Sequence, residues 1–173
     1  SFLNRISVWD QKLFMSINSR PHWRVTDKLG MIIDLWYYLV IGYAALIGED
    51  WKLLIKILLL AIVINSLLLK RIFKKRRVST VLPLVSVVDK PLPQKFKSAD
   101  TYGFPSGSAA ISMAVAVALM AIDSQTRLVG IAMVGVNGIQ RLYTGAHLPS
   151  EVIGGWITGG LTAMVGLRLI GAI

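Results

Sequence analysis

The chain has 173 residues, 54% of them hydrophobic, a mean hydropathy of +0.62 and a formal net charge of +10. This composition is too apolar for an ordinary soluble domain, and the absence of cysteine excludes disulfides and thiolate metal sites. The presence of only two histidines argues against a zinc site, and the basic excess favours phospholipid headgroups over nucleic acid as the anionic partner.

The first predicted element is an amphipathic helix over residues 2–17. We expect it to lie in the membrane interface, although docking on another part of the protein fits the pattern about as well. Apolar residues recur in it every three or four positions, at Phe2, Ile6, Trp9, Leu13 and Ile17.

Five apolar segments are then predicted to cross the membrane, because each approaches the ~20 apolar residues that a bilayer requires. Short polar turns, GED at 48–50 and DSQT at 123–126, separate the first segment from the second and the third segment from the fourth. The fifth contains GGWITGG, whose small residues would let neighbouring helices approach closely. The five segments cover residues 29–47, 51–69, 106–122, 127–143 and 149–170.

The stretch from 71 to 105 is too polar and too rich in proline to span a bilayer. Its apolar part, residues 81–88, suits an interfacial or re-entrant segment. The expected fold is therefore all-α: one integral membrane domain over residues 1–173, with about five transmembrane helices and an N-terminal interfacial helix. The first 20 residues lack the pattern of a cleavable signal peptide.

With five spans, the N-terminal helix and the loops at 70–105 and 141–149 share one face of the membrane. That face carries 15 of the 19 basic residues, including six of the nine residues in KRIFKKRRV at 70–78. The positive-inside rule would make this face cytoplasmic. A binding site for anions would produce the same asymmetry for another reason, so we give the rule little weight here.

Several residues on this face are suited to holding phosphate. The turn Pro105-Ser106-Gly107 precedes a helix, whose first N–H groups and dipole bind anions, and Gly107 lets the backbone come close. Arg77 and Arg141 can fork onto phosphate oxygens, and Lys70 adds a point charge.

His147 is the candidate nucleophile, since an imidazole can take a phosphoryl group covalently. Glu151 follows four residues later, at the start of a helix, where its carboxylate can orient the other ring nitrogen. Taken singly, these signals are weak: most Pro-Ser-Gly turns are ordinary caps, and a basic run after a span is usually a headgroup anchor. Together, at three membrane ends on one face, they are much stronger.

The order of these motifs resembles that of the PAP2 superfamily, the type 2 phosphatidic acid phosphatases that act on membrane lipids. Its three motifs are Lys-x6-Arg-Pro, Pro-Ser-Gly-His and Ser-Arg-x5-His-x3-Asp. WDQKLFMSIN also resembles that family's opening helix, so the likeness covers nearly the whole chain. The matching segments here are Lys70 to Arg77, PSGS at 105–108, and QRLYTGAHLPSE at 140–151, which holds Arg141, His147 and Glu151 in register.

The resemblance implies that His147 forms a phosphohistidine, that Glu151 orients it, and that no metal or cofactor is needed. It also implies phosphate binding by Lys70, Arg77, Ser106, Gly107 and Arg141.

The main departure from the family is Ser108, which stands where the family has the histidine that protonates the leaving alcohol. A hydroxyl is a poor acid at neutral pH, and general acid catalysis is worth about 10²–10⁴-fold, so we expect impaired turnover. The serine is either an introduced inactivating change, which we favour, or a natural variation. Val78 for Pro, Gln140 for Ser and Glu151 for Asp look tolerable.

The expected activity is phosphate hydrolysis on a lipid headgroup in a bacterial inner membrane, with the site on the periplasmic face by family resemblance. Lipid A 1-phosphate is the preferred substrate, because the dense basic loop favours a multiply anionic lipid. Phosphatidylglycerophosphate, undecaprenyl pyrophosphate and phosphatidic acid are the other candidates. Two further hypotheses stay open: a lipid phosphotransferase, and a non-catalytic binder of anionic lipids, which Ser108 motivates.

Overall fold

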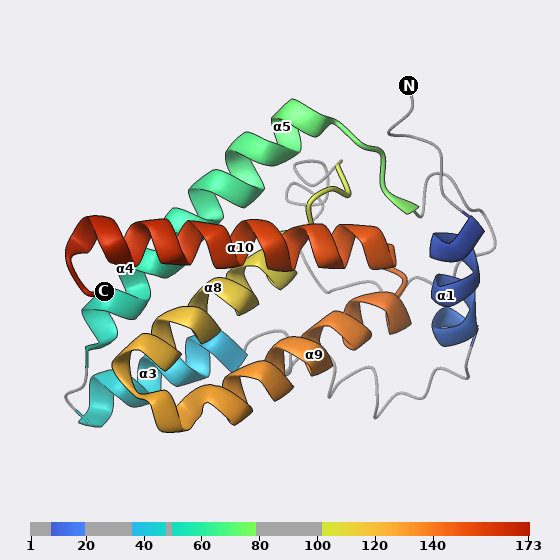
Figure 1. Cartoon of the computed structure of the whole chain (residues 1–173). Coiled ribbons are helices and arrows are strands. Elements are labelled where there is room, and N and C mark those ends of the chain that lie inside the picture. Colours follow the sequence, from blue (N-terminus) through green and yellow to red (C-terminus); the bar gives the residue numbers. More distant parts are fainter. Residues whose placement is uncertain (1–7, 20–35, 48–49, 79–101) are drawn as a thin grey trace.

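The computed structural model describes residues 8–19, 36–47, 50–78 and 102–173. In these ranges the regular elements are helices. One isolated antiparallel β-bridge pairs Arg76 with Tyr102. Figure 1 shows the long helices packed side by side, with α1 across one end of the bundle. The elements are α1 (Val8–Asn18), α3 (Trp36–Ile47), α4 (Trp51–Ala61), the π-helix η2 (Ile62–Leu69), α5 (Lys70–Phe73), α8 (Gly107–Ile122), the 3₁₀ turn η3 (Ser124–Thr126), α9 (Arg127–Tyr143) and α10 (Pro149–Ile170).

The all-α prediction is confirmed, and the helix boundaries agree closely with the expected segments. Helices α9 and α10 have the predicted bounds, and α8 begins one residue later than predicted. The helix from Trp51 continues through η2 to Phe73, four residues beyond its predicted end. Of the first predicted span, the structure describes the part from Trp36, and the predicted segment 81–88 lies outside the described residues.

The helices have the composition of a membrane protein. Trp51–Phe73 and Pro149–Ile170 are long and apolar enough to cross a bilayer, and Trp36–Leu46 and Gly107–Ile122 are shorter apolar helices. Many large apolar side chains are exposed on the outer faces of the helices, which is typical of a surface that contacts lipid rather than water. Examples are Leu39, Leu46, Leu59, Leu68, Leu128, Ile131, Ile157, Leu161 and Leu169.

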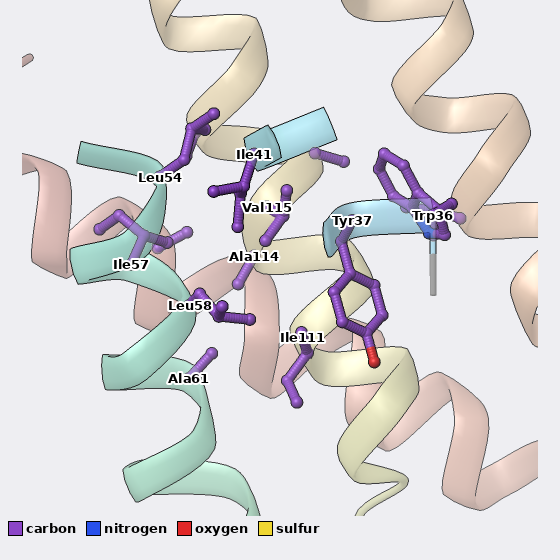
Figure 2. Close-up of a cluster of buried hydrophobic side chains, with 14 of the residues drawn as sticks. Trp36, Tyr37, Ile41, Leu54, Ile57, Leu58, Ala61, Ile111, Ala114 and Val115 are labelled. Carbon is purple, nitrogen blue, oxygen red and sulfur yellow. The ribbon is translucent and has the colours of Figure 1, made fainter. Parts of the chain in front are cut away.

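The main core lies between α3, α4, α8 and α10, and α8 runs through its centre (Figure 2). Alanines on α8, such as Ala114, let its neighbours approach, and Leu54 and Ile57 of α4 fill the space beside them. Trp36 of α3 is tied to this helix because its Nε1 donates to Ser112 Oγ at 2.9 Å.

Helices α8 and α10 pack backbone to backbone, as the GGWITGG segment predicts. A Cβ added at Gly155 would lie 2.5 Å from the Ser106 carbonyl oxygen, and one added at Gly159 would meet the Ala110 backbone. Ser106 N also donates to the Glu151 carbonyl oxygen at 2.9 Å. The start of α8 is therefore fixed against the start of α10.

The N-terminal helix packs mainly through a face other than its apolar stripe, of which Ile17 alone among the described members contacts the second core. Its buried residues are Asp10, Phe14 and Asn18, whereas Trp9 and Leu13 of the predicted stripe are 51% and 45% exposed. Residues 2–7 of the predicted helix lie outside the described part of the chain. Phe14 joins a second core at the end of the bundle with Val78, Ala109, Leu142, Leu148 and Val152.

Candidate active site

His147 lies in a short loop that the end of α9 builds. Gly145 adopts a left-handed conformation (φ 69°), which turns the chain out of the helix. The backbone N–H groups of Ala146 and His147 then donate to the Arg141 carbonyl oxygen at 3.1 and 3.3 Å. The imidazole is consequently buried at the junction between α9 and α10.

Glu151 faces His147 from the first turn of α10. Its Oε2 lies 3.1 Å from His147 Nδ1 and also accepts a hydrogen bond from Leu148 N at 3.1 Å. Both side chains are buried. The carboxylate thus orients the ring and leaves the other imidazole nitrogen, Nε2, for a different partner.

The second oxygen of Glu151 forms an ion pair with Lys75, a residue for which the sequence predicted no role. Lys75 Nζ lies 3.4 Å from Glu151 Oε1, and Lys75 is itself buried. The Lys75 carbonyl oxygen accepts from Gly103 N at 2.8 Å, next to the bridge between Arg76 and Tyr102. Gly103 is needed there, because an added Cβ would lie 2.7 Å from Glu151 Oε1.

The turn at 105–108 forms the start of α8. Ser106 is its N-cap in an extended conformation and is fully buried, and Gly107 begins the helix. A Cβ at Gly107 would lie 2.8 Å from Ser66 Oγ and 3.9 Å from Lys70 Nζ, so a lysine side chain reaches this helix start. No described residue forms a hydrogen bond with the hydroxyl of Ser106 or of Ser108.

The three predicted phosphate-binding cations reach this region from α5, from the segment that follows α5, and from α9. Lys70 begins α5, Arg77 follows α5, and Arg141 is buried in the last turn of α9. Lys70 and Arg77 lie close enough to His147 to act on its pKa. The structure therefore brings together the segments that the sequence predicted.

Burial sets the charge state of the histidine. The pKa of His147 is lowered to about 4, mainly by burial; the hydrogen bond and charge of Glu151 oppose this shift, and the charges of Arg77 and Lys70 add to it. Burial likewise lowers the pKa of Arg77, and Glu151 opposes that shift. The imidazole of His147 is therefore neutral near pH 7, which leaves one ring nitrogen with a free lone pair.

Three residues in or beside the site were not predicted from the sequence: Lys75, Ser66 and Asp10. Lys75 lies within the basic run, but nothing in KRIFKKRRV singles it out from its neighbours. Ser66 belongs to η2, a π-helical stretch of the kind often found at functional sites. Asp10 is part of WDQKLFMSIN, where its spacing gave no sign of its partner on α10. Within the described ranges, no three His, Asp or Glu side chains come together as a metal site.

The fold and site define a helical membrane protein whose histidine–carboxylate pair adjoins a helix N-terminus and several cations. Residues 51–172 match the model of the PAP2 superfamily, and the chain belongs to that superfamily. It is accordingly a lipid phosphate phosphatase of the membrane-bound PAP2 type, a phosphoric monoester hydrolase.

Two solved structures have a similar fold. LpxE from Aquifex aeolicus has a TM-score of 0.74 at 22% sequence identity, covering 94% of this chain and 96% of its own. The first transmembrane PAP2 type phosphatidylglycerolphosphate phosphatase from Bacillus subtilis has a TM-score of 0.67 at 16% identity, covering 96% and 89%. No curated protein matches the sequence significantly. At these identities the likeness concerns the fold.

Proposed function

We propose that this chain removes phosphate from a lipid headgroup through a phosphohistidine on His147. The observation that supports this most is the buried pair of His147 and Glu151, 3.1 Å apart, beside the start of α8. The carboxylate of Glu151 is itself held by Lys75 and by Leu148 N. A lipid anchor or a purely structural histidine would not require such an arrangement.

In the first step, Nε2 of His147 attacks phosphorus and the bond from phosphorus to the lipid oxygen breaks. Glu151 accepts the hydrogen bond from Nδ1–H and stabilises the positive charge that the ring acquires. Water then attacks the phosphohistidine, releasing inorganic phosphate and restoring the neutral imidazole. Lys70, Arg77, Arg141, the hydroxyl of Ser106 and the N–H group of Gly107 are proposed to hold the phosphate oxygens.

The departing lipid oxygen needs a proton, and Ser108 occupies the position where the superfamily's motif has histidine. A serine hydroxyl cannot supply that proton efficiently near neutral pH. We therefore infer that this chain binds phosphate but turns over slowly.

Lipid A 1-phosphate is our preferred substrate, because the basic segment 70–78 suits a headgroup with several negative charges. The alternatives are phosphatidylglycerophosphate, undecaprenyl pyrophosphate and phosphatidic acid. We place the protein in a bacterial inner membrane with five spans, α3, α4–α5, α8, α9 and α10, and an interfacial α1. Exposed Trp9 and Leu13 on α1 support an interfacial position, and family resemblance favours a periplasmic site.

The test is phosphate release from these four lipids in detergent micelles. It compares the chain with Ser108, the Ser108→His variant, and each of these two with His147→Ala added. We expect release by Ser108→His, a trace by the chain with Ser108, and none after His147→Ala. Labelled substrate should leave an acid-labile adduct on His147. Full activity in His147→Ala, or an adduct on another residue, rules out the assignment.

Ser108 also favours a second candidate function, a non-catalytic binder of anionic lipids. This alternative predicts that the lipids bind but that neither the chain with Ser108 nor Ser108→His releases phosphate. Residual release that disappears with His147→Ala excludes it. Product analysis with an added acceptor lipid separates hydrolysis from phosphotransfer.

A further inference from the structure

Helix α1 contacts both ends of the loop that carries His147. At one end, Asn18 Nδ2 donates to the carbonyl oxygen of Tyr143, the last residue of α9, at 3.0 Å. At the other end, Asp10 Oδ1 accepts from Ser150 N at 2.9 Å and Asp10 Oδ2 accepts from Ser150 Oγ at 2.6 Å. One short helix therefore holds the last residue before the loop and a residue just after it (Figure 1).

The contact of Asp10 with Ser150 supplies a cap that α10 lacks. The N-cap position of α10 is Leu148, whose side chain cannot accept a hydrogen bond from the first turn. Asp10 accepts one of these N–H groups from a distant helix, and a carboxylate at a helix N-terminus is stabilised by the helix dipole. The next residue after Ser150 is Glu151, so the capped turn is the one that orients His147.

The burial of α1 follows the same pattern. Asp10, Phe14 and Asn18 lie four residues apart on one face, and all three are buried. Phe14 is fully buried and packs in the cluster that includes Leu142 and Leu148, on either side of the loop. This face points at the loop ends.

We propose that Asp10 and Asn18 are positioning residues for the phosphatase reaction, which fix the loop ends so that His147 stays aligned with Glu151. This inference rests on the proposed function of His147. Neither residue is assigned a contact with substrate. Their effect is on the placement of an imidazole, where a shift of about 1 Å can cost about 10²-fold in rate.

The experiment compares Asp10→Ala, Asp10→Asn and Asn18→Ala in the full chain, each with Ser108 and with Ser108→His. Asparagine can accept from Ser150 N and donate to Ser150 Oγ, so it keeps the geometry without the charge. Gln11→Ala, at an exposed position on α1, is the control for the helix. Ile57→Val, in the main core, is the control for lost stability.

We expect Asp10→Ala to lower kcat by roughly 10-fold or more with KM changed less than about two-fold, as for a group that aligns the reacting atoms. Asp10→Asn should recover most of kcat, and Asn18→Ala should show a smaller loss. The inference is wrong if Ile57→Val, at an equal loss of Tm, lowers kcat as much as Asp10→Ala. It is also wrong if Asp10→Asn is as slow as Asp10→Ala.

A second readout does not depend on turnover. The charged groups that act on the His147 imidazole are Glu151, Lys70 and Arg77. In ¹⁵N-histidine NMR, loosening of the loop should move the titration of His147 from about 4 toward its ordinary value in Asp10→Ala, and Asp10→Asn should leave it in place. If no variant releases phosphate, the proposed function fails, and this titration alone decides whether α1 positions His147. If Asp10→Ala does not fold, Asn18→Ala takes its place in both readouts.

Discussion

Nδ1 of His147 lies 3.1 Å from Oε2 of Glu151, and the two residues are only four apart in the chain. This contact forms because α10 begins between them: His147 precedes the helix, whereas Glu151 belongs to its first turn. The carboxylate is buried, so it interacts with the ring in a medium where electrostatic effects are stronger than in water. The pair is therefore the part of the site most sensitive to a change of one atom.

Glu151→Gln tests this sensitivity, because it keeps the size of the side chain and removes its charge. We expect kcat to fall by about 10²–10⁴-fold, since an amide neither fixes the productive tautomer nor stabilises the charged ring. Initial rates of phosphate release in the Ser108→His background are the measurement. Glu151→Asp, which keeps the charge, is the matched control and should lose much less. Equal losses in the two variants would mean that the charge is not what matters.

The lowered pKa of His147 has a consequence for stability. The pKa falls from its ordinary value of 6.5 to about 4 in the fold, so between these values the unfolded chain binds a proton that the folded chain does not. The contribution of His147 to the free energy of unfolding is therefore fully present above pH 6.5, and it decreases as the pH falls from 6.5 to about 4. Thermal unfolding at pH 7 and at about pH 5 should show a larger loss of Tm in the unsubstituted chain than in His147→Gln. A ¹⁵N titration midpoint near 6.5 would contradict this prediction.

Lys75 is expected to stabilise the fold by pairing with the buried carboxylate of Glu151. Replacing it with methionine keeps the apolar length of the side chain and removes the charge 3.4 Å from Oε1. Loss of a partner to a charged group should lower the free energy of unfolding by about 1–3 kcal/mol, measured by denaturant unfolding in detergent. Lys74→Met is the control, since that neighbouring side chain is exposed. Equal stability of the two variants would argue against the pair.

The close contact of α8 with α10 can be tested with two adjacent glycines. Gly159→Ala would push a methyl group into the Ala110 backbone, and such overpacking costs about 1–3 kcal/mol. Gly160→Ala is the control, because its Cβ would lie 3.6 Å from Met113 Cγ, an ordinary contact. Alanine there should be neutral or stabilising by up to about 1 kcal/mol through helix propensity. If both substitutions are neutral in denaturant unfolding, α8 and α10 are not packed this closely.

Much of this arrangement could be predicted from the sequence. The segment DSQT precedes α9, and TGAHLP separates the end of α9 from the start of α10. The spacing of His147 and Glu151 across this helix start indicates their contact. These features depend on residues close together in the chain.

The contacts that could not be predicted depend on tertiary structure. Lys75 faces Glu151 because Lys74 adopts a left-handed conformation (φ 47°) and turns the chain away from α5, which a row of similar basic residues does not indicate. The apolar stripe of Trp9 and Leu13 did not indicate which face of α1 packs on the bundle. The packed face follows Asp10, whose partner is 140 residues away in the chain.

Ser108→His is the substitution with the largest predicted effect. An imidazole at this position can protonate the departing lipid oxygen near neutral pH, so we expect kcat to rise by roughly 10²–10⁴-fold. The groups proposed to hold phosphate, Lys70, Arg77 and Arg141, are unchanged, so KM should change far less. Steady-state phosphate release from lipid in micelles measures both constants, and Ser108→Ala, which removes the hydroxyl, should match the chain with Ser108. If Ser108→His leaves turnover unchanged, another group delivers the proton. If Ser108→Ala abolishes the residual rate, the serine itself takes part, because the hydroxyl is the only difference between this variant and the chain with Ser108.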